Sequence, residues 1–156
     1  MPRHALKALA ALGLAFICAT AGADEHRSRI NYMLHCQGCH LPDGTGIEDR
    51  IPQLKNFVGL YLHDEDGRAY VINVSGVATA PLPDDQLSEL INWMLVNFSA
   101  KELPELFRPY TAAEVSELRK QQERDPAARR TRILDRLRES RPDLEIAAEP
   151  AEYRPD

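Results

Sequence analysis

The 156-residue sequence is poor in cysteine, methionine and tryptophan, with 3, 3 and 1 copies, and it contains no internal repeat. Two of the cysteines form one Cys-x-x-Cys pair, and no second pair of cysteines or histidines follows at a similar spacing. A structural zinc site usually takes four ligands from two such pairs. The lack of a second pair therefore argues against a fold held together by zinc. The length of the chain suits one domain with an additional segment.

The sequence also lacks an excess of positive charge and an apolar run long enough for a membrane span. It has 24 acidic against 19 basic residues, a net charge of −5. Negative charge disfavours nucleic acid and anionic lipid as partners and favours a basic surface on another protein. The longest apolar run, from Ala8 to Cys18, is shorter than the roughly 20 residues that cross a bilayer. We expect no stable membrane span.

The N-terminus has the pattern of a secretory signal peptide. Arg3 and Lys7 precede the apolar run, and Ala21-Gly22-Ala23 supplies small residues before the charged Asp24. We therefore expect residues 1–23 to be removed and the protein to be periplasmic or otherwise exported. The remaining chain would have 17 basic against 24 acidic residues, a net charge of −7.

The run Cys36-Gln37-Gly38-Cys39-His40 has the spacing of a c-type haem attachment site. Each thiol can add to one haem vinyl group, and the histidine then ligates the iron from the proximal side. An exported Cys-x-x-Cys pair becomes oxidised unless its thiols are captured. We expect one covalently bound haem c, attached to Cys36 and Cys39, with His40 as the proximal iron ligand.

Two other interpretations of this run stay open. It could be half of a zinc site, although the other histidines are scattered along the chain. It could also be a redox-active dithiol, which in the thioredoxin pattern follows a buried strand. Residues 24–35 are too polar for such a strand.

The hydrophobic pattern predicts several helices and leaves two short runs open. A first helix is expected from about residue 27 to 37, then a loop over residues 41–56 rich in glycine and proline. The short apolar runs 57–62 and 69–74 do not decide between helix and strand, a turn is expected at 63–67, and a loop at 76–83. From Asp84 an apolar stripe predicts a core-facing helix, formed by Leu87, Leu90, Ile91, Met94, Leu95 and Phe98.

The character of the chain changes after residue 100. Thr111 opens a capping box for a polar helix to about residue 124. Asp125 and Pro126 then predict the start of a helix to about Ser140. We divide the chain into a signal peptide (1–23), a monohaem domain (24–100), a helical extension (101–140) and a tail expected to be disordered (141–156).

From about residue 27 to 98 the chain resembles a small class I c-type cytochrome. The family has an aromatic residue four positions before the first haem cysteine, and Tyr32 stands there. It has a glycine-containing loop after the haem histidine, as Gly44 and Gly46 provide here, and then a proline-leucine pair, for which Pro52 and Leu54 are placed. It also has an aromatic residue on the last helix, which here is Trp93. The resemblance implies an all-α fold of the small cytochrome c type, followed here by the helical extension. In that fold the first and last helices cross around a covalently bound haem, with Tyr32 against Trp93. It also implies that the Pro52 carbonyl accepts a hydrogen bond from His40, which would fix the imidazole.

The sequence departs from this family at the sixth iron ligand. The family usually has a methionine, often followed by proline, in the loop before the last helix, and here Ala80-Pro81 stands there. His63 is a candidate sixth ligand because it is the only histidine after His40. Met94 is a weaker candidate because a methionine on a core stripe is usually packing. A vacant sixth site is the other alternative.

The resemblance implies a non-enzymatic electron carrier that moves single electrons through its haem. A second hypothesis is an open haem used for ligand sensing or peroxide chemistry, for which His63 and Arg68 are the nearby candidates. A third is a cytochrome subunit of a larger dehydrogenase or oxidase, docked through the extension. The sequence does not identify the electron donor, the acceptor, the reduction potential or the oligomeric state.

Overall fold

The computed structural model describes residues 24–48 and 50–146, and within these ranges the protein is all-α, as predicted. The N-terminal helix is described over residues 24–35. It is followed by η1 (Val58–His63), α2 (Glu65–Asn73), α3 (Ser75–Ala78), α4 (Asp84–Ser99), η2 (Ala100–Glu102), α5 (Ala112–Leu118) and α6 (Pro126–Ser140). The expected signal peptide and most of the expected disordered tail lie outside the described residues.

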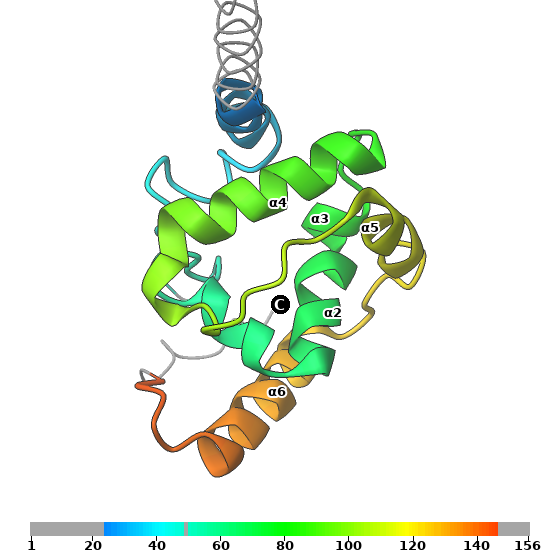
Figure 1. Cartoon of the computed structure of the whole chain (residues 1–156). Coiled ribbons are helices and arrows are strands. Elements are labelled where there is room, and N and C mark those ends of the chain that lie inside the picture. Colours follow the sequence, from blue (N-terminus) through cyan, green and yellow to red (C-terminus); the bar gives the residue numbers. More distant parts are fainter. Residues whose placement is uncertain (1–23, 49, 147–156) are drawn as a thin grey trace, which may run out of the picture.

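Helix α4 is the longest element of the described chain and the centre of the fold (Figure 1). Asp84 and Asp85 stand in its first turn, where negative charge interacts favourably with the helix dipole. All six residues of its predicted apolar stripe are buried. The spacing of the apolar positions thus correctly identified both this helix and its inward face.

The N-terminal helix packs against α4, as the resemblance implied. The Tyr32 ring lies 5.7 Å from Trp93 and 5.0 Å from Phe98, measured between ring centroids. At the other end of the contact, Arg27 pairs with Glu89 at 2.6 Å. Tyr32 is only 1% exposed, so this aromatic contact closes one side of the core.

The face that the N-terminal helix buries is not its most apolar one. Ser28 and Asn31 are buried with Tyr32, whereas the large apolar residues of this helix, Ile30, Met33 and Leu34, are exposed. A serine four residues before Tyr32 has a small side chain, which lets the helix approach its neighbour closely. The spacing of apolar residues predicted the helix here but not its buried side.

The middle of the chain is more helical than its sequence indicated. The ambiguous runs became η1 and α2, and part of the expected loop at 76–83 became the short helix α3. The turn expected at 63–67 is instead a helix start, because the Asp64 carboxylate accepts a hydrogen bond from Gly67 N at 2.9 Å and caps α2. Packing against neighbouring helices decides such short segments.

The extension packs back onto the rest of the chain. Its helices α5 and α6 bury Val115, Ile133, Leu134 and Leu137 in the same hydrophobic core as α2 and α4. Helix α6 begins at Pro126 and ends at Ser140, as its cap residues predicted, whereas α5 stops at Leu118, earlier than expected. Beyond α6, Leu144 and Ile146 still rest against the core. None of the helices in the described part is long and apolar enough to cross a membrane.

Candidate haem-attachment site

The Cys36–His40 run forms a tight turn at the end of the N-terminal helix. The Tyr32 carbonyl accepts hydrogen bonds from the backbone N–H groups of Cys36 and Gln37, at 2.9 and 3.0 Å. The His40 N–H then donates to the Cys36 carbonyl at 3.0 Å. Gly38 makes the turn possible with φ of 115°, a backbone conformation that glycine adopts without strain. Helix and turn therefore place the two cysteines and the histidine together.

The side chains of this run have few interactions with the rest of the described chain. Cys36 is half-buried and Cys39 is exposed, and neither forms a disulfide. Burial, followed by the charge of Cys39, raises the pKa of the Cys36 thiol to about 11. Neither thiol is thus committed to a disulfide, and that of Cys39 is open to solvent.

His40 has a buried nitrogen that the fold leaves unsatisfied. Its Nδ1 is buried without a hydrogen-bond partner. Burial lowers the pKa of His40. The backbone of Pro52 lies close to the ring and acts in the opposite direction, raising this pKa, although it does not form a hydrogen bond with Nδ1. A buried, unpaired imidazole nitrogen is costly for a structural residue. A hydrogen bond from Nδ1 to the nearby Pro52 backbone would remove this cost and leave Nε2 for a metal.

Zinc ligation gains no support from the surroundings of the run. In residues 24–48 and 50–146, no group of three or more His, Cys, Asp or Glu side chains is gathered so that it could hold a metal ion. The two cysteines and His40 therefore have no further protein ligand among the described residues.

The loop after His40 is fastened to the N-terminal helix and to its own later part. The Tyr32 hydroxyl donates to the Leu41 carbonyl at 2.7 Å. The Gly44 carbonyl accepts from the N–H groups of Leu54 and Lys55, at 2.9 and 3.0 Å. This second contact holds Leu54, and with it the Pro52 segment, against the start of the loop.

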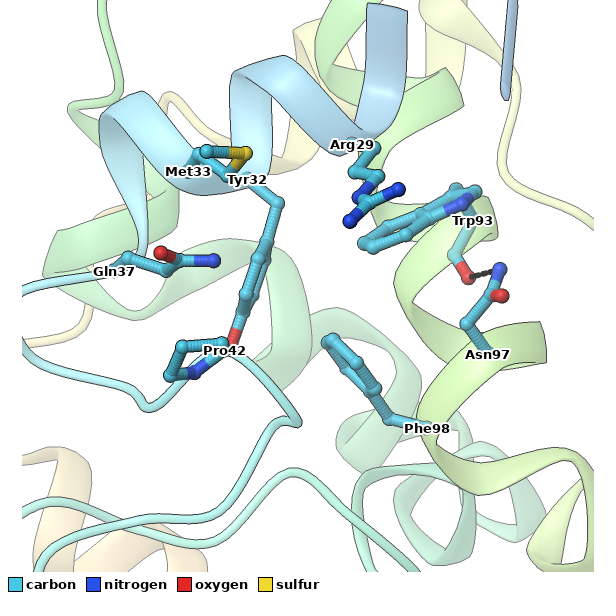
Figure 2. A pocket seen from close by; sticks show the side chains of 8 residues that line it. All are labelled: Arg29, Tyr32, Met33, Gln37, Pro42, Trp93, Asn97 and Phe98. Atoms are coloured by element: carbon cyan, nitrogen blue, oxygen red, sulfur yellow. Dashed lines mark hydrogen bonds between the residues drawn. The ribbon is translucent and has the colours of Figure 1, made fainter. Parts of the chain in front are cut away.

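A hollow of about 370 Å³ lies beside this turn (Figure 2). Tyr32 projects into it from the N-terminal helix, and Trp93 and Phe98 face it from α4. Gln37 and Pro42 close the side nearest the cysteines. The contact between the two helices is therefore aromatic but not fully filled.

The two residues considered for peroxide chemistry are both bound to the C-terminal part of the chain. His63 Nε2 lies 3.0 Å from the Glu102 carbonyl, and its Nδ1 lies 2.8 Å from Arg141 Nη1. Arg68 is 6% exposed and donates to both carboxylate oxygens of Glu114, at 2.6 and 2.8 Å. Its guanidinium also lies 4.0 Å above the ring of Tyr110. Neither side chain has a free polar atom for a ligand in this arrangement.

The methionines do not offer a ready iron ligand either. Met94 is 4% exposed and packs in the core, as its place on the α4 stripe predicted. Met33 is 52% exposed and lies on the helix that leads into the cysteines. Ala80 is buried, and the segment around it is hydrogen-bonded to Arg119, a residue that sequence reasoning missed. Arg119 stands at the end of a polar helix, and nothing in the local sequence there indicates a contact with the segment around Ala80.

Gly44 is the most constrained position of the loop, and we predict that Gly44→Ala lowers the free energy of unfolding by about 2 kcal/mol. Its φ is 81°, where a side chain costs about 1–2 kcal/mol. An added Cβ would also lie 2.7 Å from Phe98 Cγ, so the ring would have to move. Urea unfolding of both proteins measures the difference.

Gly76→Ala is the matched control for this prediction. Gly76 lies in α3, and an added Cβ would meet nothing within 4 Å. We expect this variant to be neutral or up to about 1 kcal/mol more stable, because alanine favours helix. Equal unfolding midpoints for Gly44→Ala and the wild type would show that the loop does not hold this conformation.

Comparisons with known proteins support a single family. No family model matches the chain, and no solved structure matches it. Two cytochromes c-552, both from Thermus thermophilus, are similar to it, each 30% identical over 102 aligned residues. The alignments cover 54% of this chain, and 78% and 69% of the two relatives. With the Cys-x-x-Cys-His turn and the all-α fold already in place, this similarity shows that the chain belongs to the cytochrome c family.

Proposed function

We propose that this protein is an exported class I cytochrome that carries single electrons through one haem c. The observation that carries the proposal is the Cys36–His40 turn, where two reduced thiols and an imidazole with an unpaired buried nitrogen follow the helix that packs on α4. In this proposal Cys36 and Cys39 hold the haem covalently and His40 is the proximal ligand. The haem supplies the one-electron iron couple.

The chain's own residues would orient and shield this group. His40 would bind iron through Nε2 and turn Nδ1 toward Pro52, whose backbone already lies near the ring. A hydrogen bond to the Pro52 carbonyl would fix the ring orientation and increase its basicity. The contacts of Tyr32 with Trp93 and Phe98 would hold the N-terminal helix, and with it the cysteine turn, against α4.

For the sixth iron position we propose His63 as the candidate ligand. A haem held by two histidines would have a lower reduction potential than one held by a histidine and a methionine. Ligation would require His63 to give up its hydrogen bonds to Glu102 and Arg141. A vacant sixth site is therefore the second candidate, and Ala80 in the place of the family's methionine favours it. In that case the haem would bind small ligands.

Location and partners follow from the sequence. We propose export through residues 1–23 to the periplasm and docking on basic surfaces of redox proteins, because the remaining chain has a net charge of −7, from 17 basic and 24 acidic residues. The extension buries its apolar residues within this chain. That packing favours a self-contained carrier over a subunit docked through the extension.

Visible spectra of the haem-loaded protein, before and after addition of carbon monoxide, test the proposal. For the six-coordinate carrier we expect no response to carbon monoxide in the wild type and a clear response in His63→Ala. Arg141→Gln is the control, because it removes a partner of His63 but leaves the imidazole. A response of equal size in all three proteins would mean an open iron and would move the ligand-binding function to first place.

A further inference from the structure

We propose that Arg119 of the C-terminal extension is a positioning residue for the segment 78–82, and that it thereby controls how readily small ligands reach the haem iron. The inference rests on the proposed function, because the resemblance to class I cytochromes places this segment over the haem face opposite His40. It assigns to the extension a role that neither the family motifs nor the sequence pattern indicated.

The contact consists of four hydrogen bonds from one guanidinium. Arg119 Nε donates to the Ala78 carbonyl at 3.0 Å, Nη2 to the Ala80 carbonyl at 2.6 Å and Nη1 to the Leu82 carbonyl at 2.9 Å. Nη1 also donates to the Asp84 carboxylate at 2.9 Å, at the first residue of α4. One side chain thus binds alternate carbonyls along the whole segment.

Only an arginine has the geometry for this contact. Its planar guanidinium presents five N–H donors in a fixed arrangement, whereas a lysine ammonium is a single point with three donors. The Arg119 side chain is 19% exposed, so these bonds are largely shielded from water. Bonds between a charged donor and shielded acceptors are among the stronger ones in proteins.

Arg119 is itself held in place by α2. It follows the last residue of α5, and the turn around it is fastened by Asn73, whose side-chain amide donates to the carbonyls of Leu118 and Gln121 at 2.8 and 2.6 Å. Val115 of α5 is fully buried. The guanidinium therefore reaches the segment 78–82 from a rigid base rather than from a mobile tail.

The backbone hydrogen bonds that the segment donates are all local. They run to acceptors two to four residues earlier in the chain: Ala78 N to Val74 O, Thr79 N to Ser75 O, Ala80 N to Val77 O and Leu82 N to Ala80 O. The buried Ala80 and Leu82 side chains add apolar contacts but no hydrogen bond to a distant element. Pro81 has no N–H to donate. The Ala80 side chain has no atom that binds iron, so an iron–ligand bond cannot anchor the segment as a methionine would. In this chain Arg119, which belongs to the extension, therefore holds the segment where the family's methionine–iron bond would hold it.

The test compares Arg119→Gln with Arg129→Gln in haem-loaded protein. Arg129 is a matched control because it is 16% exposed and pairs with Asp66 and Glu123, yet it binds α6 to α2 rather than to the segment. In Arg119→Gln we expect backbone hydrogen exchange of residues 78–82 to become about tenfold faster, since several shielded bonds are lost. In Arg129→Gln the exchange of this segment should stay as in the wild type.

Carbon monoxide binding to the reduced protein gives the second measurement, and it is made in the His63→Ala background so that the proposed sixth ligand does not block the iron. We expect the association rate to rise severalfold in Arg119→Gln and to stay unchanged in Arg129→Gln. Arg119→Lys, which keeps the charge near Asp84 but not the bonds to three carbonyls, should behave like Arg119→Gln in both measurements. This lysine variant also serves as the test protein if the glutamine variant does not fold.

The outcomes separate the inference from the proposed function. If haem attaches but both Arg119 variants match the wild type in exchange and in carbon monoxide binding, the positioning role is wrong and the cytochrome function stands. If exchange rises equally in Arg119→Gln and Arg129→Gln, Arg119 acts only on global stability and the inference also fails. If no haem attaches to the wild type at Cys36 and Cys39, the proposed function itself fails, whatever the exchange data show.

Discussion

Replacement of both Cys36 and Cys39 by serine is expected to abolish covalent haem attachment completely. A serine hydroxyl does not add to a haem vinyl group, so no bond to the cofactor can form at either position. In the structure both thiols are free of disulfides, so the wild type has two of them available in one turn. Mass spectrometry of denatured protein, matured in a host that attaches haem, should show one haem per wild-type chain and none in the double variant.

His35→Ala is the control for this experiment. His35 is the last residue of the N-terminal helix, one position before Cys36, and it is half-buried like His40. It has no role in the proposed site, so its variant should carry the same covalent haem as the wild type. Covalent haem in the double serine variant, or none in a folded and exported wild type, would contradict the assignment of the two cysteines.

Glu114→Gln is expected to lower the free energy of unfolding by about 4 kcal/mol. Its carboxylate accepts two hydrogen bonds from Arg68, whose side chain is 7% exposed. Glutamine keeps the shape of the side chain but leaves the Arg68 charge buried without its opposite charge. Breaking one side of a buried ion pair typically costs about 3–5 kcal/mol. Urea unfolding monitored by circular dichroism measures the loss.

Glu117→Gln is the matched control on the same helix. Glu117 pairs with Lys120 three residues later, but their side chains are 74% and 62% exposed. Exposed pairs of this kind contribute about 0.5 kcal/mol or less, because water screens them. Similar losses in the two variants would show that the extension does not depend on the Arg68–Glu114 pair.

The same pair makes a prediction about pH. Hydrogen bonds from Arg68 hold the pKa of Glu114 below its usual value of 4.5. A carboxyl whose pKa is lowered by folding stabilises the protein above its unfolded-state pKa, and this stabilisation disappears as the pH falls through the folded-state pKa. The stability difference between wild type and Glu114→Gln should therefore be constant near neutral pH and shrink below about pH 4.5. A difference that grows on acidification would contradict this assignment.

Local sequence was sufficient wherever a structure depends on neighbouring residues. Caps and periodicity act over a few residues, so they could be predicted. The predictions that the structure confirms are helix α4 with its buried stripe, the start of α6 at Asp125-Pro126 and the cap at Thr111. The family motif placed Tyr32 against Trp93, and their ring distance of 5.7 Å confirms it. The short runs around α2 could not be assigned, because their period fits both a helix and a strand.

The residues by themselves thus determined the candidate haem motif and the core-facing side of α4, and the family resemblance implied the all-α class. The tertiary structure alone decided the burial of Ser28 and Asn31 in preference to the apolar residues beside them. It also decided that the extension binds Arg68 through Glu114 and the segment 78–82 through Arg119. These polar contacts join residues 37 to 46 positions apart, as the Arg119–Leu82 and Arg68–Glu114 pairs do. Their partners are chosen by how the helices pack, and no local pattern of residues records that choice.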